Sequence, residues 1–326
     1  MKHRSKVIVS GFAGSGSSAV VDLLSEIEGY FTLGKEFRLL TDPDGVMDLE
    51  TALISGWSPY KSDLAIKRFR SLIRHLGKKN RYPYINQNFT RTLSADFIKI
   101  SEEYIQELLS FSYHGVWVGI NSPYTRWLKR LHKHFNLEIR KRLPEIFISY
   151  PREGFYDVTR EYMEKLVDAA SNKQTIEDTV IIDDPFSSLN CDSVLKYLHS
   201  SKILIIHRDP RDTFLNAVKY KYSFIPLEVD QFILWYRYMQ EHTFKNTNRN
   251  AVLRINFEDM VLHYHETKQA IFDFLEISSE DHQSPLKYFN PEISGKNVQL
   301  WKNGIRDGDI QKIENELGDY FYDFGE

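Results

Sequence analysis

The chain has 326 residues, of which 42 are Lys or Arg and 45 are Asp or Glu, so its formal net charge is −3. This balance excludes a general binder of nucleic acid, because such proteins carry a basic excess. The single cysteine, Cys191, excludes a disulfide framework and a cysteine-rich zinc site. No apolar run reaches the roughly 18 residues that a membrane span needs. The apolar run behind the basic N-terminus, Val7-Ile8-Val9, is too short for a signal peptide, so we expect a cytoplasmic protein.

The chain begins with an expected strand, a Gly/Ser loop and a helix. Val7-Ile8-Val9 is a β-branched run typical of a strand buried on both faces. The loop Gly14-Ser15-Gly16-Ser17-Ser18 follows. Apolar residues then recur at helical spacing, namely Ala19, Val20, Leu23, Leu24 and Ile27. Such a loop offers backbone N–H groups, hydroxyls and the positive end of a helix dipole, which suit a phosphate or sulfate. The spacing fits a P-loop, but Ser17 stands where the P-loop lysine belongs.

Residues 48–175 are expected to form a mostly helical insertion within a single domain of residues 1–326. Two sets of apolar residues recur there at helical spacing: Leu64, Phe69, Leu72, Ile73 and Leu76, and Ile98, Tyr104, Ile105, Leu108 and Leu109. Residues 126–142 hold seven Lys or Arg and one acid, Glu138, and predict a basic amphipathic helix. Such a helix is either a solvated face of a packed helix or a surface for weak contact with an anionic acceptor or membrane.

Three further buried runs predict strands at Val180–Ile182, Lys202–His207 and Ala251–Phe257. Strands that alternate with helices predict an α/β fold with a doubly wound, mostly parallel sheet. Ligands of such sheets bind beyond the carboxyl ends of the strands. The Gly/Ser loop, Asp183-Asp184 and Arg208 all follow strand ends, so we expect them to share one anion site.

Several of these segments together resemble the sulfotransferases that use 3′-phosphoadenosine 5′-phosphosulfate (PAPS). Gly14–Ser18 is similar to the P-loop-like phosphosulfate loop of that family. Arg208-Asp-Pro-Arg-Asp212 resembles their Arg-(Asp/Asn)-Pro-(Arg/Lys)-Asp turn, whose first arginine holds the 3′-phosphate, and Asn216 stands where the family usually has a serine on that phosphate. The tail that begins at Trp301 resembles the closing helix of many members, and Lys302 in it is a further candidate for contact with the donor phosphates.

The acceptor side is suggested by the tyrosylprotein members of the family. Gly34-Lys35-Glu36-Phe37-Arg38 resembles the segment in which they keep a catalytic glutamate and, two residues later, an arginine that contacts the substrate. The resemblance therefore implies Glu36 as the base that takes the proton of the acceptor hydroxyl, and Arg38 as an acceptor contact. Asp183 is the alternative base, and Asp184 is a second candidate contact with the acceptor.

Two cations that the family normally carries are missing. Gly14 stands in the loop where relatives have Lys or Arg, and Asp183 stands where the tyrosylprotein enzymes have Lys. A leaving phosphosulfate oxygen is stabilised by a positive partner. Lys35 and Lys302 are the candidates to replace the missing charge.

The resemblance implies in-line transfer of a sulfuryl group from PAPS to a hydroxyl, with 3′-phosphoadenosine 5′-phosphate (PAP) as the product. A saccharide is the expected acceptor. No metal is expected, because the histidines lack metal-ligand spacing. Two alternatives stay open. One is an ATP-dependent kinase or phosphotransferase of the P-loop type, which the missing lysine at Ser17 opposes. The other is a catalytically degenerate nucleotide-binding module, which Gly14 and Asp183 favour.

Overall fold

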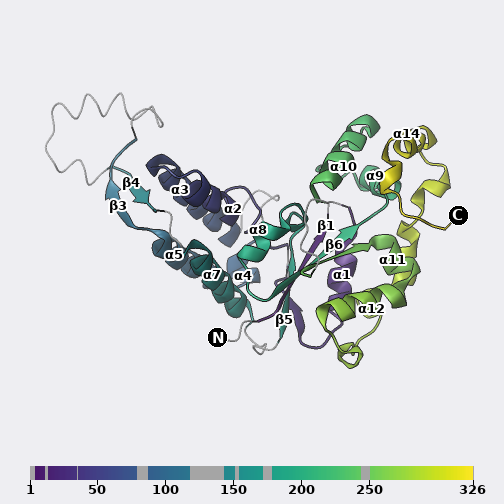
Figure 1. Ribbon diagram of the computed structural model, residues 1–326, viewed down its shortest axis with the longest axis horizontal. Coiled ribbons are helices and arrows are strands. Elements are labelled where there is room, and N and C mark those ends of the chain that lie inside the picture. The colour runs from purple at the N-terminus through teal and green to yellow at the C-terminus, as the bar shows by residue number, and fades with distance from the viewer. Residues whose placement is uncertain are drawn as a thin grey trace. The chain divides into compact units, whose positions relative to one another are not determined.

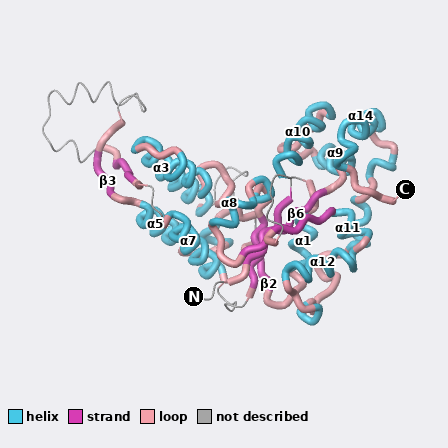
Figure 2. Tube along the Cα trace, viewed as in Figure 1, coloured by secondary structure: helices cyan, strands magenta, loops and turns pink. Residues whose placement is uncertain are grey.

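The chain folds into two compact units. The computed structural model describes residues 4–11, 14–34, 36–78, 87–117, 143–150, 154–171, 178–243 and 250–325. The first unit is formed by Met1–Arg38 and Ser171–Glu326, and the second by Leu39–Ala170. The second unit overlaps the predicted insertion of residues 48–175. Figure 1 and Figure 2 show the elements of each unit.

A parallel sheet forms the centre of the first unit. In the described part of the chain its five strands have the order β2-β5-β1-β6-β7, and every neighbouring pair is parallel. The strands are β1 (Lys6–Gly11), β2 (Tyr30–Thr32), β5 (Thr179–Asp183), β6 (Ser201–His207) and β7 (Val252–Asn256). The predicted α/β fold and the four predicted strands are therefore confirmed. Strand β2 was not predicted, because it has only three residues and lies at the edge of the sheet.

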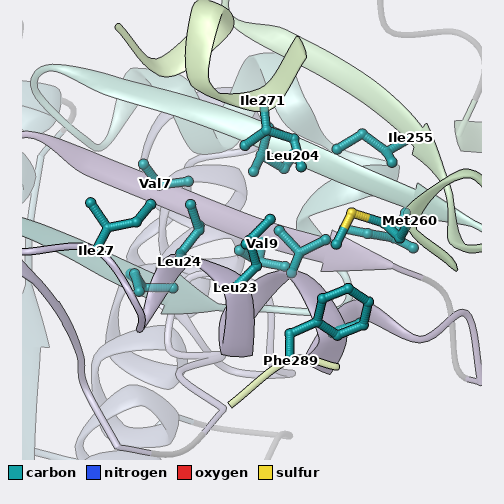
Figure 3. Close-up of a cluster of buried hydrophobic side chains, with 14 of the residues drawn as sticks. Val7, Val9, Leu23, Leu24, Ile27, Leu204, Ile255, Met260, Ile271 and Phe289 are labelled. Atoms are coloured by element: carbon teal, nitrogen blue, oxygen red, sulfur yellow. The ribbon is translucent and has the colours of Figure 1, made fainter. Parts of the chain in front are cut away.

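Helices cover both faces of this sheet. Residues of one parity on the strands, such as Val7, Val9 and Leu204, pack against α1 (Ser17–Leu24), α11 (Phe257–Leu262) and α12 (Tyr264–Leu275) in one buried cluster, which Figure 3 shows. Ser10 has the other parity, and its Oγ accepts a hydrogen bond of 2.8 Å from the backbone N–H of Ser188. Ser188 lies in η4 (Ser187–Leu189), just before α8 (Cys191–Lys196). The sheet is therefore doubly wound.

The point where the strand order reverses lies between β1 and β6. Strand β1 is followed by α1, on the face that Figure 3 shows. Strand β6 is followed by α9 (Pro210–Tyr220) and α10 (Val229–Thr243), and α10 contacts η4 on the other face. These two helices pack with α14 (Asp307–Leu317) in a second apolar cluster. Ligands bind at such a reversal, beyond the carboxyl ends of the two strands.

Short elements complete the first unit after α12. They are η5 (Ser279–Asp281), α13 (Pro291–Ser294), η6 (Gly295–Asn297), η7 (Leu300–Asn303) and, after α14, η8 (Gly318–Tyr320). Within the described residues, no helix is long and apolar enough to cross a membrane.

The second unit is mostly helical where it is described. It holds α2 (Val46–Glu50), the π-helical η1 (Thr51–Ser55), α3 (Pro59–Gly77), α4 (Phe89–Thr92), α5 (Phe97–Leu108), α7 (Phe155–Ala170) and the antiparallel pair β3 (Phe111–His114) and β4 (Glu145–Ile148). The two predicted apolar sets lie on α3 and α5, where residues such as Phe69 and Ile105 are buried. The β3–β4 pair was not predicted, because strands of four residues are too short for a periodic pattern. The predicted basic helix at 126–142 lies outside the described residues.

Candidate active site

Glycine is required in the loop that follows β1. Gly14 has φ 81° and Gly16 has φ 86°, a left-handed conformation that glycine adopts without strain. A Cβ on Gly16 would stand 2.4 Å from Cδ2 of Phe257, so no side chain fits at this position. The predicted loop residues therefore have a backbone shape that only glycine supports.

The same loop presents hydrogen-bond donors at the start of α1. Ser17 and Ser18 open α1, and the N-cap Gly16 supplies no side-chain acceptor to the first N–H groups of this helix. Ser15 is buried, and among the described residues its Oγ has no hydrogen-bond partner. Free N–H groups and a free hydroxyl at a helix N-terminus suit an oxyanion.

Arg208 brings a guanidinium to this loop from the end of β6. Its Nη1 donates a hydrogen bond of 3.0 Å to the carbonyl of Gly14, and its Nη2 donates one of 2.6 Å to the carbonyl of Asn297. The guanidinium lies 5.0 Å from the ring centre of Phe257, and the residue is only 5% exposed. Its Nε has no partner within the described part of the chain. The sequence-predicted loop and arginine therefore come together, and a buried positive charge stands beside the position where the family's loop cation is missing.

The neighbouring Asp209 is held by another arginine. Asp209 is the N-cap of α9, and its carboxylate accepts hydrogen bonds from the Nε and Nη2 of Arg211, at 3.0 and 2.8 Å. The Arg211 guanidinium is sandwiched between the rings of Trp301 and Phe321, at 4.0 and 4.1 Å from their centres. The backbone N–H of Asp209 donates to Oε1 of Glu258 at 2.9 Å. Asp209 and Arg211 thus fix the turn that positions Arg208.

Two buried carboxyl groups surround Arg208. Burial raises the pKa of Asp212 to about 6, although the charge of Arg208 and the backbone N–H groups of Gln299 and Leu300 oppose this rise. Burial likewise raises the pKa of Glu258 to about 7. At neutral pH Glu258 is therefore partly protonated, and it neutralises Arg208 incompletely.

Two carboxylates and an arginine meet at the carboxyl end of β5. The backbone N–H of Phe37 donates to the carbonyl of Asp183 at 2.7 Å, which ties the predicted acceptor segment to this strand. Arg38 Nη1 lies 3.1 Å from Oε2 of Glu36, whose side chain is 47% exposed. Burial, and next the charge of Glu36, raise the pKa of Asp183 to about 6 against the opposing charge of Arg38. The structure therefore brings together both candidate bases and the candidate acceptor contact.

The other predicted residues are placed differently. Asn216 is buried on α9, and its Oδ1 has no partner among the described residues. Lys302 is exposed on η7. Asp184 is 1% exposed and its Oδ1 accepts from the backbone N–H of Phe186 at 3.0 Å, which favours a structural role over a contact with the acceptor. Lys35 lies outside the described residues.

Three residues that shape the site were not predicted. Thr213 lies against the loop, Phe257 packs on Arg208, and Asn297 contributes its backbone carbonyl. Thr213 precedes Asn216 by three positions, so its place on the same helix face was the one signal in the sequence. Phe257 has the pattern of an ordinary core residue, and a backbone carbonyl leaves no trace in a sequence.

The arrangement suits the transfer of an anionic group to a hydroxyl. The donors between β1 and β6 are N–H groups, hydroxyls and a guanidinium, which bind phosphate and sulfate oxygens. The carboxylates at the end of β5 can take a proton from a hydroxyl. Within the described ranges, no cluster of three or more His, Cys, Asp or Glu could hold a metal ion.

A model of the sulfotransferase family matches residues 7–281 of the chain. The chain belongs to the sulfotransferase family. The resemblance drawn from its motifs is thereby confirmed: this sulfotransferase is an enzyme that transfers sulfuryl groups, and its family implies PAPS as the donor and PAP as the product. No curated protein sequence matches the chain.

Several solved sulfotransferase structures are similar to this one at low identity. Sulfotransferase STF9 from Mycobacterium avium is 11% identical, with 98% of this chain and 77% of that chain covered and a TM-score of 0.41. The sulfotransferase domain of the Synechococcus PCC 7002 olefin synthase is 13% identical, with 92% and 90% covered and a TM-score of 0.43. The sulfotransferase domain of the curacin biosynthetic pathway is 10% identical, with 97% and 98% covered and a TM-score of 0.45.

Proposed function

We propose that this sulfotransferase moves the sulfuryl group of PAPS to a hydroxyl by in-line displacement, and that the hydroxyl belongs to a saccharide. The observation that carries the proposal is the contact of the buried Arg208 guanidinium with Gly14 in the loop. It supports one continuous site for an anionic donor, formed by the ends of β1 and β6.

The residues at this site fit the donor chemically. The loop N–H groups and the Ser15 hydroxyl would hold the 5′-phosphosulfate end, and Arg208 with Asn216 would hold the 3′-phosphate. Ser15 Oγ and Arg208 Nε can both donate, so oxygens of PAPS would satisfy two buried groups that have no partner among the described residues. When bound, PAPS would supply the sulfuryl group that is transferred. The 5′-phosphate to which this group was attached stays on PAP, the leaving product.

We also propose that Arg208, while it holds the 3′-phosphate, adds positive electrostatic potential to the donor site next to Gly14. Charge builds up on the oxygens of the transferred and leaving groups during such a displacement, and a preorganised cation stabilises it. Arg208 is held in place by two backbone carbonyls, those of Gly14 and Asn297, and by the ring of Phe257. Lys35 and Lys302 stay the proposed candidates for the cation at the leaving phosphosulfate oxygen.

Glu36 is the proposed base. Its half-exposed carboxylate can reach an acceptor hydroxyl, and the 3.1 Å ion pair with Arg38 fixes its direction. Asp183 stays the alternative base, since its pKa of about 6 leaves it ionised at neutral pH. In either case the carboxylate takes the hydroxyl proton as the oxygen attacks sulfur.

The proposal of a saccharide acceptor is supported by exposed aromatic side chains of the second unit. We propose that this unit is the acceptor-side insertion. Phe111, Tyr113 and Tyr150 are exposed, and the Trp57 and Tyr150 rings stack with centres 4.9 Å apart. Exposed aromatic groups of this kind mark binding surfaces, and their faces can pack on the apolar face of a sugar ring. The cytoplasmic location and the contact of residues 126–142 with anionic surfaces stay predictions.

A transfer assay with radiolabelled PAPS tests the proposal. We expect label to pass to a hydroxyl of one or more members of a saccharide panel, and not to a tyrosyl peptide. Transfer to the peptide alone would overturn the saccharide assignment. Stabilisation against heat by ATP with magnesium, but not by PAP, would instead favour the kinase. PAP binding without transfer to any acceptor would favour the degenerate module.

A further inference from the structure

The hydroxyl of Thr213 is buried and unused. Thr213 lies on α9, one helical turn after the N-cap Asp209, and is 3% exposed. Its Oγ1 has no hydrogen-bond partner among the described residues. A buried hydroxyl without a partner destabilises the folded protein, so it calls for an explanation.

Other threonines of this chain behave differently in helices. Thr51, Thr159 and Thr243 each donate their hydroxyl proton to the backbone carbonyl four residues earlier, at 3.0, 2.8 and 2.9 Å. The corresponding carbonyl for Thr213 is that of Asp209, which accepts only the backbone N–H of Thr213, at 2.9 Å. The Thr213 side chain is therefore turned away from the bond that helical threonines usually make.

The Thr213 side chain lies beside the loop. Thr213 Cγ2 lies 3.7 Å from the point where a Cβ of Gly14 would stand, and Arg208 Nη1 donates to the carbonyl of the same glycine. Asn216 follows Thr213 by three positions and shares its face of α9. Thr213 and Arg208 thus both lie against Gly14, and Thr213 Oγ1, Asn216 Oδ1 and Arg208 Nε are all buried without a partner among the described residues.

We propose that Thr213 binds the donor nucleotide, its Oγ1 donating a hydrogen bond to an oxygen of the 3′-phosphate that Arg208 holds. The inference rests on the proposed function, because it needs PAP or PAPS at this site. A threonine hydroxyl donates one proton and can rotate to meet an anionic oxygen, so it complements the fixed fork of the guanidinium. Thr213 is then a specificity-determining residue, since it contacts the phosphate that distinguishes PAP from 5′-AMP.

Replacing Thr213 with Val removes the hydroxyl at nearly constant shape. We expect calorimetric titration to show PAP bound about tenfold more weakly by T213V than by the unchanged protein, as for the loss of one hydrogen bond to a charged group. Affinity for 5′-AMP, which lacks the 3′-phosphate, should not change. T213S keeps the hydroxyl and should keep the affinity for PAP. T243V is the matched control. It removes an equally buried helical hydroxyl on α10 and should bind PAP with the affinity of the unchanged protein.

The thermal melt of the ligand-free variants separates binding from structure. T213V should melt at the same or a higher temperature than the unchanged protein, because the lost hydroxyl had no partner. A lower melting temperature together with equal weakening of PAP and 5′-AMP would overturn the proposal, and so would unchanged PAP affinity in T213V. If the unchanged protein bound no PAP, the proposed function itself would fail. Binding by the unchanged protein with no effect of T213V would contradict only the role of Thr213.

Discussion

Replacing Asp183 with Asn should stabilise the ligand-free enzyme at alkaline pH. Burial, and next the charge of Glu36, raise the pKa of Asp183 from 3.8 to about 6, while Arg38 opposes the rise. The folded protein therefore holds this proton more tightly than the unfolded chain does. The stability that the protonated group provides is complete below pH 4 and is lost as the pH rises through about 6. A difference of about two pKa units corresponds to a loss of about 3 kcal/mol at pH 8.

Urea unfolding at pH 4 and at pH 8 measures this effect. The free energy of unfolding of D183N, minus that of the unchanged protein, should be about 2 kcal/mol larger at pH 8 than at pH 4, where the unfolded carboxyl is already partly ionised. If the effect of D183N on the free energy of unfolding did not depend on pH, the ionised Asp183 would not destabilise the folded protein. That result would refute the pKa rise that burial and the charge of Glu36 cause.

Three other substitutions test the base, the loop and the frame of the site. E36Q should lower kcat by about 10²–10⁴-fold with PAP affinity unchanged, as measured by steady-state kinetics and titration; an unchanged kcat would move the base elsewhere, to Asp183 first. G16A should weaken PAP binding by about tenfold or more, because the residue has φ 86° and its Cβ would stand 2.4 Å from the Phe257 ring; titration with normal affinity would contradict this loop geometry. E26Q should lower the free energy of unfolding by about 3 kcal/mol in a urea titration. The reason is that the fully buried Glu26 carboxylate pairs with His282 at 2.8 Å and accepts hydrogen bonds from three backbone N–H groups. A variant as stable as the unchanged protein would show that these bonds do not stabilise the fold.

The main strands of the fold could be predicted from the sequence because they are buried on both faces. Val180–Ile182 and Lys202–His207 are apolar runs for this reason, and β5 and β6 lie inside the sheet. Strand β2 is different: it has three residues, none of them buried, so it leaves no pattern that distinguishes it from a loop. The pair β3–β4 joins segments about 30 residues apart, and no local pattern reports such a pairing.

The residues of the candidate site that follow directly after strands could be predicted from the sequence. Parallel strands bring the Gly14–Ser18 loop, Asp183 and Arg208 to one edge, and the structure places them there. The contact between Arg208 and the loop could not be predicted, because it depends on the direction of the Arg208 side chain, whose Nη1 donates to the carbonyl of Gly14. The roles of Lys35 and Lys302 stay predictions.

Titration of PAP into the enzyme and its R208A variant tests the central claim most directly. Arg208 is buried, and its guanidinium donates to the carbonyl of Gly14 in the loop and to that of Asn297. We predict micromolar binding by the unchanged protein and a loss of about 100-fold in R208A, because two charge-assisted hydrogen bonds are removed. The matched control is R237A, at a half-buried arginine that pairs with Glu316, and it should bind normally. Equal PAP affinity in R208A and the unchanged protein would contradict the account of Arg208 as the cation of the donor site.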